Sequence, residues 1–155
     1  MMQVHVCAVG RLRAGPERAL LDDYLQRFER VGRGIGLGRV REHEVVAKGG
    51  MGGEADALGR VLAKGAVVCV LDERGKQMSS PEFAKILAGW RDQGRGDAAF
   101  VIGGADGLAP EFRKCADFRL SLGTMVWPHM LVRVMLGEQL YRAASILSGS
   151  PYHRI

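Results

Sequence analysis

Residues 66–71 read AVVCVL, an uninterrupted apolar run that is followed directly by the polar stretch DERG at residues 72–75. A strand that is apolar along its whole length is typical of a parallel sheet, where both faces are covered. A second apolar run, AAFVI at residues 98–102, ends in the glycine-rich stretch GGADG at residues 103–107. These two runs predict strands of a mostly parallel sheet, each of which leads into a loop that could hold chemistry.

The sequence on either side alternates between strand and helix patterns. Further strands are expected at residues 2–9, 40–46 and 118–122. Helices are expected from Pro16 through Phe28, at residues 54–63, from Ser79-Ser80-Pro81, from Pro110, and from Pro128 to about Leu147, with glycine-rich loops at residues 31–38 and 48–53. This order predicts one α/β domain spanning residues 1–155, with a mostly parallel sheet and helices on both faces.

The composition indicates an ordinary globular chain of 155 residues, 47% of them hydrophobic and 25% charged. No apolar run reaches the roughly 18 to 20 residues that a membrane span requires, and the first residues lack a signal-peptide pattern. We therefore expect a cytoplasmic protein without a membrane partner. The formal charge of +5 favours an anionic partner such as RNA, although solubility alone also explains a charge of this size.

The three cysteines, Cys7, Cys69 and Cys115, are far apart in the sequence and form no CxxC pair. Their spacing matches no metal site and no disulfide framework. We expect them to be small buried apolar residues, and we expect no metal site.

Ligands of open α/β sheets bind beyond the carboxyl ends of the strands, where three loops qualify here. These loops cover residues 72–75, 103–107 and 122–127. The adjacent Gly103 and Gly104 allow a backbone to approach a ligand closely, although a tight turn is the alternative explanation. The chain lacks the GxGxxG and GxxxxGK[ST] motifs of dinucleotide and P-loop sites. The stretch LGTMVW at residues 122–127 suits a flat ring, unless its side chains belong to the core.

The last expected helix is apolar on nearly all sides, so its own chain or a partner must bury it. We take this pattern to favour a dimer interface. Glu138 and Arg142 have the four-residue spacing of an ion pair on a helix surface. Arg133 has no obvious local partner and is therefore a candidate for function.

The chain ends with Tyr152, His153 and Arg154, which bring together an aromatic ring, a titratable group and a guanidinium. That combination suits a nucleotide, and an exposed tail without a role is the alternative. His129, next to Pro128, either caps the last helix or lines a pocket.

The order of these motifs resembles one family of SPOUT methyltransferases. The stretch GGADGL at residues 103–108 is similar to that family's IGGxxGL motif, and Leu120-Ser121, Pro128-His129, Val132-Arg133, residues 138–143 and Tyr152-His153-Arg154 continue the match in order. Ala8-Val9-Gly10, Leu71-Asp72 and Gly75-Lys76 extend the resemblance over nearly the whole chain. The family is the ribosomal large-subunit RNA methyltransferase H family, whose members are pseudouridine N3 methyltransferases.

The resemblance implies a C-terminal trefoil knot, S-adenosylmethionine as cofactor, and 23S ribosomal RNA, within the assembled ribosome, as substrate. It also implies a homodimer formed through the last helix. Carried over by position, the cofactor contacts are Leu71, Gly103, Gly104, Leu122, Gly123, Thr124, Met125, Val126 and Trp127. The tail would reach the partner's cofactor and the target base.

Catalytic roles are expected for His153, Arg154, Tyr152 and Arg142. In this hypothesis His153 or a water accepts the N3 proton, while Arg154 or Arg142 stabilises the developing uracil anion. The alternative functions are a basic RNA-binding factor without catalysis and an α/β enzyme that acts on a small molecule.

Overall fold

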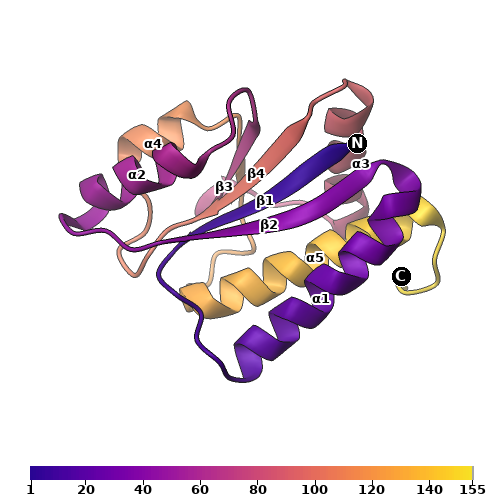
Figure 1. The fold of residues 1–155 in the computed structure, drawn as a ribbon, viewed down its shortest axis with the longest axis horizontal. Coiled ribbons are helices and arrows are strands. Elements are labelled where there is room, and N and C mark those ends of the chain that lie inside the picture. Colours follow the sequence, from indigo (N-terminus) through magenta and orange to yellow (C-terminus); the bar gives the residue numbers. More distant parts are fainter. Residues whose placement is uncertain (155) are drawn as a thin grey trace.

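The apolar runs pair in a single sheet, in which all neighbouring strands are parallel (Figure 1). The computed structural model describes residues 1–154. Its strands are β1 (Met2–Val9), β2 (Leu37–Val45), β3 (Val67–Lys76), β4 (Asp97–Ile102) and β5 (Phe118–Leu120), in the spatial order β2-β1-β4-β3-β5. The carboxyl ends of the strands therefore meet at one edge of the sheet, as the predicted α/β class requires.

Helices cover both faces of the sheet. The helices are α1 (Pro16–Gly32), η1 (Arg33–Ile35), α2 (Gly50–Val61), α3 (Ser80–Asp92), α4 (Pro110–Cys115) and α5 (His129–Ser148). Successive side chains of a strand point to opposite faces. In β1, Val4 and Val6 accordingly pack in the cluster of α1, α3 and α5, whereas Cys7 and Val9 pack against α2. The prediction of helices on both faces is confirmed.

The start of α3 follows from its local sequence. The Ser79 hydroxyl accepts the backbone N–H of Glu82 at 3.2 Å, and the Glu82 carboxylate accepts the Ser79 backbone N–H at 3.5 Å. These reciprocal bonds satisfy two N–H groups that the first turn of a helix leaves unpaired. Pro81, which needs no such partner, completes the turn.

The two glycine-rich stretches were predicted as loops, and both predictions were wrong in part. In residues 31–38, α1 continues to Gly32 and one turn of η1 follows. A Cβ on Gly32 would lie only 2.9 Å from the Leu37 carbonyl, so a residue without a side chain is needed where the chain turns back. In residues 48–53, α2 already begins at Gly50. Burial of Ala57 and Leu58 against the sheet offsets the poor helix propensity of the glycines.

The end of β3 also differs from the prediction of a simple loop at residues 72–75. The strand leaves its ladder after Leu71 and returns at Lys76, and both residues pair with Leu120. The returning segment presses against β5, since a Cβ on Gly75 would lie 2.7 Å from the backbone of Arg119. Strand β5 itself ends at Leu120, two residues earlier than expected.

Most of the apolar surface of α5 is covered within one chain. Leu136, Leu140 and Ala144 are fully buried where α5 packs beside α1 and α3 (Figure 1). Met130 and Leu131, near the start of the helix, keep 41% and 40% of their surface exposed. The all-round apolarity of this helix therefore has a cause within the chain and does not by itself require a partner.

Two of the three cysteines match their prediction. Cys7 and Cys69 are buried, and burial raises the pKa of the Cys7 thiol to about 12. Cys115, at the end of α4, is exposed, which corrects the expectation that all three are buried. Within residues 1–154 no helix is both long enough and apolar enough to cross a bilayer.

Candidate functional site

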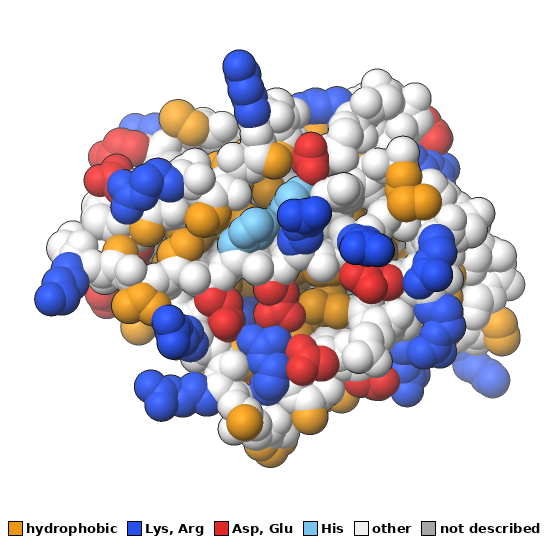
Figure 2. All heavy atoms as spheres, viewed as in Figure 1, with side chains coloured by type: hydrophobic (Ala, Val, Ile, Leu, Met, Phe, Trp, Pro, Cys, Tyr) orange, Lys and Arg blue, Asp and Glu red, His pale blue; other side chains and the backbone are white. Residues whose placement is uncertain are grey.

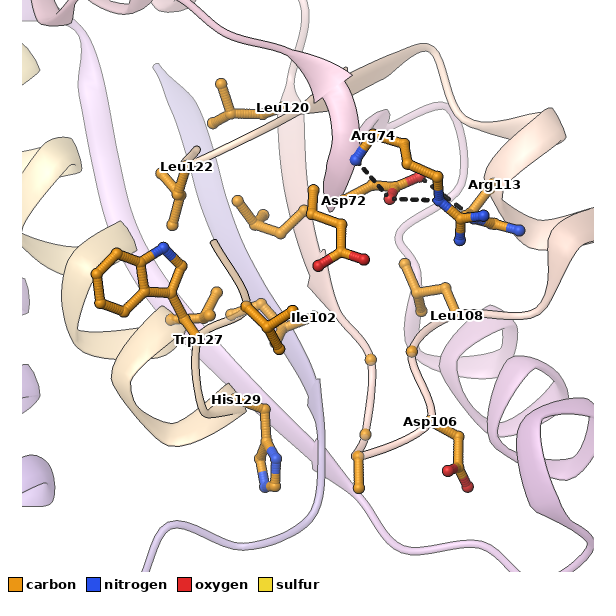
Figure 3. Close-up of a pocket in the computed structure, with 18 of the residues that line it drawn as sticks. Asp72, Arg74, Ile102, Asp106, Leu108, Arg113, Leu120, Leu122, Trp127 and His129 are labelled. Atoms are coloured by element: carbon orange, nitrogen blue, oxygen red, sulfur yellow. Dashed lines mark hydrogen bonds and ion pairs between the residues drawn. The ribbon is translucent and has the colours of Figure 1, made fainter. Parts of the chain in front are cut away.

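A pocket of about 270 Å³ opens where β3, β4 and β5 end (Figure 3). Its walls come from residues 71–74, from residues 102–108 and from the segment between residues 120 and 127, with contributions from Arg113 and α5. The three loops that the sequence marks as ligand loops therefore meet around one cavity. They meet because parallel strands place their carboxyl ends side by side.

Eight of the nine residues predicted to contact the cofactor line this pocket, namely Leu71, Gly103, Gly104, Leu122, Gly123, Met125, Val126 and Trp127. Thr124 is exposed and does not contribute to the lining. Met125 and Val126 keep 70% and 81% of their surface exposed, so the alternative that this segment is core is wrong. The segment forms a rim above the pocket.

The loop after β4 is tightly closed on itself. A Cβ on Gly103 would lie 2.7 Å from the Gly107 carbonyl carbon and 2.9 Å from the Leu108 nitrogen. Both are backbone atoms, so no side-chain rotation could make room. Gly107 has a φ of 79°, which an L side chain rarely adopts. The second glycine, Gly104, faces the carboxylate of Glu54 on α2.

One side of the pocket is polar. The Asp72 carboxylate, which is 7% exposed, lies 3.6 Å from both Arg74 Nε and Arg113 Nη1, as the dashed lines of Figure 3 show. The Nε of Arg113 is buried and has no hydrogen-bond partner among the described residues. Sequence reasoning did not select Arg113, because its partner Asp72 is distant in the chain and no local pattern connects them.

The opposite side of the pocket is apolar. Figure 3 shows Ile102, Leu120, Leu122 and Trp127 around this side, with His129 at its lower border. The hydroxyl of Ser121 holds the rim in place, since it accepts the Gly123 N–H at 3.1 Å and lies 3.0 Å from the Glu73 carbonyl. The sequence left two roles open for His129, a cap of the last helix or a pocket residue, and its position in the lining agrees with the second.

The C-terminal tail folds back onto the end of α5. The Arg142 Nε donates to Glu138 at 2.9 Å, and the Arg142 guanidinium lies over the Tyr152 ring at 4.8 Å. The Arg142 Nη1 lies 3.1 Å from Nδ1 of His153. The ion pair predicted from the four-residue spacing is confirmed, and it also organises the tail. Arg154 is exposed.

The tail and the pocket lie at opposite ends of α5. His129 and Val132 of the first turn border the pocket, whereas Tyr152 to Arg154 follow the last turn. A helix of 20 residues is about 30 Å long at 1.5 Å per residue. Within one chain, the structure therefore does not bring the four predicted catalytic residues to the predicted cofactor residues.

Arg133 has a structural role that its sequence context concealed. Its side chain is 2% exposed, and it donates to Glu44 and to the carbonyls of Val9 and Gly10. The absence of a local partner suggested function, but the partners are 89 to 124 residues away in the sequence. Arg133 thus ties the start of α5 to the ends of β1 and β2.

Two other histidines lie away from the pocket. His5 stands on β1 between His43 and Asp97, with nitrogen–nitrogen and nitrogen–oxygen distances of 3.1 Å and 2.7 Å. Histidine side chains accordingly lie together near the centre of the face in Figure 2. Burial, followed by the charges of His5 and Arg41, lowers the pKa of His43. Both residues belong to strands, as expected.

Comparison with known proteins decides the family. A family model described as "Predicted SPOUT methyltransferase" matches residues 2–153. A protein of Ruegeria sp. (strain TM1040), named ribosomal RNA large subunit methyltransferase H, is 67% identical over 99% of this chain and all of its own length. The protein of that name from Roseobacter denitrificans is also 67% identical, over 99% of both chains. The chain belongs to the ribosomal RNA large subunit methyltransferase H family.

Solved structures agree on the SPOUT fold. A probable methyltransferase from Bordetella pertussis Tohama I superposes with a TM-score of 0.55 at 12% identity, over 92% of this chain and 95% of its own. A probable methylase family protein from Haemophilus influenzae Rd KW20 gives a TM-score of 0.51 at 10% identity, over 99% and 70%. Family membership implies the trefoil knot.

The pocket residues fit S-adenosylmethionine, the cofactor of SPOUT methyltransferases. Small-ligand pockets combine mostly apolar walls with a few placed polar groups. Here the apolar side suits an adenine ring, and the polar side offers the carboxylate of Asp72 and the unpaired Nε of Arg113. The amino-acid end of the cofactor carries both an ammonium and a carboxylate, so each polar group would find a partner of opposite charge.

Proposed function

We propose that this protein, acting in the cytoplasm, transfers a methyl group from S-adenosylmethionine to N3 of a pseudouridine in 23S ribosomal RNA within the assembled ribosome. The single observation that carries the proposal is the meeting of the three predicted ligand loops around one pocket, in a chain that is 67% identical over its length to a ribosomal RNA large subunit methyltransferase H. The cofactor residues carried over by position would act largely through their backbone and the apolar rim.

The bound cofactor supplies a methyl group that its sulfonium has already activated. The remaining work for the protein is to position the base, exclude water and stabilise the charge that develops on the uracil ring. The apolar side of the pocket excludes water from the reacting atoms. The tail supplies the charged groups.

The 20-residue length of α5 leads us to propose a homodimer with a shared site. If two copies of α5 pack antiparallel about a two-fold axis, the tail of one protomer lies beside the pocket of its partner. The exposed Met130 and Leu131 at the start of the helix would then be covered. In this arrangement Tyr152, His153 and Arg154 complete the site of the partner.

The contacts of the tail favour particular roles for its residues. Burial, then a hydrogen bond with Tyr24, raises the pKa of Tyr152 to about 12, so its hydroxyl keeps its proton near neutral pH. This favours a packing role for the Tyr152 ring, which lies against Arg142 and Tyr141, over a role as the base. Arg142, held by Glu138 and stacked on Tyr152, is the charged group with the most fixed position.

The contact between Arg142 and His153 constrains how the proton leaves N3. Because a guanidinium can only donate, Nδ1 of His153 is the acceptor and Nε2 of the neutral ring carries the hydrogen. With this contact kept in the assembled site, Nε2 of His153 offers an N–H to a uracil oxygen and neither ring nitrogen is available to take the N3 proton. Of the two acceptors considered, water is favoured, with Arg154 or Arg142 stabilising the anion.

The test is transfer of a tritiated methyl group to ribosomes that lack the modification, followed by mapping of the labelled nucleotide. We expect label at N3 of one pseudouridine in 23S RNA. Label on another atom or in the small subunit would refute the assignment. Cofactor binding without any transfer would indicate a non-catalytic RNA-binding factor instead.

A further inference from the structure

A second groove, of about 440 Å³, runs along β5, which is an edge strand of the sheet. Five cationic side chains line it, namely Arg74, Lys76, Arg113, Lys114 and Arg119. We call this surface the basic groove. The two segments that form it flank β5, because the end of β3 returns to pair with Leu120 while α4 leads directly into that strand.

Three of the five cations of the basic groove have no acidic partner within residues 1–154, and the other two share Asp72. The carboxylate of Asp117, which also lines the groove, accepts the backbone N–H of Val68 at 2.8 Å. Asp72 lies 3.6 Å from Arg74 and Arg113, beyond hydrogen-bonding distance. Five cations minus these two acids leave a local charge of +3, out of +5 for the whole chain. For Lys76, Lys114 and Arg119 there is no ion pair within residues 1–154.

Some arginines elsewhere on the molecule are paired, whereas the exposed Arg30, Arg33 and Arg39 have no ion pair within residues 1–154. Arg18 contacts Asp22, Glu42 and Glu44, and Arg27 contacts Asp23. Figure 2 shows acidic groups interspersed with basic ones on the face that it presents. The basic groove differs from these scattered exposed arginines because five cations from two segments of the chain line one cavity. The pattern indicates that the basic groove receives an anionic ligand.

The position of the groove connects it to the candidate active site. Arg74 and Arg113 line both the groove and the cofactor pocket, so the two cavities are adjacent. The Nε of Arg113, one of these two shared residues, is a buried donor without a hydrogen-bond partner within residues 1–154. A chain of phosphates lying in the groove would therefore lead from the edge of the sheet to the mouth of the pocket.

We propose that the basic groove binds successive phosphates of the ribosomal RNA strand next to the target nucleotide. This inference rests on the proposed function, because it takes RNA as the substrate. Lysine and arginine contacts to phosphates position a nucleic acid without reading its sequence. Each contact also releases a counterion, so binding through the groove weakens as the salt concentration rises.

The test compares the wild type with a triple variant, Lys76→Gln, Lys114→Gln and Arg119→Gln, which leaves the cofactor-pocket residues Arg74 and Arg113 unchanged. A control variant with the same loss of charge carries Arg30→Gln, Arg33→Gln and Arg39→Gln. These exposed residues lie on α1, η1 and β2, and β2 is the opposite edge strand of the sheet. Binding of a 23S RNA fragment and kcat/KM for ribosomes are measured from 50 to 300 mM KCl, and S-adenosylhomocysteine binding is measured by calorimetry.

Three lost contacts should reduce the slope of log affinity against log salt by about 2, since single strands contribute about 0.7 per phosphate. The same slope predicts that the triple variant binds the RNA fragment about tenfold to a hundredfold more weakly than the wild type at 0.1 M salt. S-adenosylhomocysteine should bind the triple variant as tightly as it binds the wild type. The proposal is overturned if the triple variant has the RNA affinity and salt slope of the control variant. The RNA-binding arm decides this even if the wild type transfers no methyl group, an outcome that would refute the proposed function alone.

Discussion

Replacement of Arg133 by methionine decides between the functional role that the sequence suggested and the structural role that the fold gives it. The side chain is 2% exposed and holds Glu44 and the carbonyls of Val9 and Gly10. Removing one partner of a buried ion pair costs about 3 to 5 kcal/mol. Glu44 keeps Arg18 and the Leu12 N–H as partners, so the lower end of that range applies.

We therefore expect Arg133→Met to lower the free energy of unfolding by about 3 kcal/mol. For a chain of 155 residues this corresponds to a fall in Tm of about 6 to 12 °C. Urea denaturation followed by circular dichroism measures the first quantity, and a thermal scan measures the second. At 20 °C, where the variant still folds, kcat for methyl transfer should remain within about threefold of the wild type, because Arg133 does not line the pocket.

The pH dependence provides an independent check on the same pair. Burial alone would raise the pKa of Glu44, but the Leu12 N–H and the Arg133 guanidinium outweigh it and lower that pKa below the ordinary value of 4.5. A lowered folded-state pKa gives stability that is present above pH 4.5 and is lost as the pH falls through the folded-state pKa. The stability difference between wild type and Arg133→Met should therefore shrink below pH 4.5.

The structural reasoning would be refuted if the free energy of unfolding of Arg133→Met lay within about 1 kcal/mol of the wild-type value while the variant lost its activity. Glu44→Gln serves as the matched control. Its effect should be smaller, since Glu44 is 26% exposed and water can replace part of its bonding. The double variant should be less destabilised than the sum of the two single variants, because the two residues share one interaction.

Three further predictions concern the site and the fold. Gly103→Ala should weaken S-adenosylhomocysteine binding by at least tenfold in calorimetry, because the new Cβ would lie 2.7 Å from backbone atoms. Gly104→Ala should weaken the binding less, because its Cβ would meet mainly the flexible end of Glu54, and equal losses for the two variants would contradict this reasoning. Tyr152→Phe should keep the pH–rate profile of the wild type between pH 6 and 9, because the pKa of Tyr152 is raised to about 12, and a shifted acidic limb would show that the hydroxyl titrates in the reaction. Ser79→Ala should lower the free energy of unfolding by about 1 kcal/mol through loss of the α3 cap, and an unchanged urea midpoint would exclude that contribution.

Local sequence predicted the elements that depend on local causes. Alternation placed β1 at its observed bounds, and Ser79 with Pro81 marked the start of α3. The prediction of loops at the glycine-rich stretches failed in part. Helix α2 begins among glycines because Ala57 and Leu58 pack on the sheet. Helix propensity describes an isolated helix and does not include the energy of packing on the sheet.

The candidate site shows the same division. The three ligand loops could be selected because a parallel sheet sends every strand end to one edge, and eight of nine expected cofactor residues line the pocket. Arg113 could not be selected, since its contact with Asp72 joins residues that are distant in the chain. The basic groove was hidden for the same reason, because its cations come from two separate segments.

The sequence by itself determined the α/β class, the strands that are buried, the loops that line the pocket and, through its motifs, the family. Tertiary structure alone decided which charges pair, and it reassigned Arg133 from a candidate functional residue to a buried tie between α5 and the ends of β1 and β2. It also separated the C-terminal tail from the pocket by the length of α5. The physical reason is range: backbone propensity and apolar periodicity act over a few residues, whereas an ion pair depends only on distance in space, which the sequence order does not state.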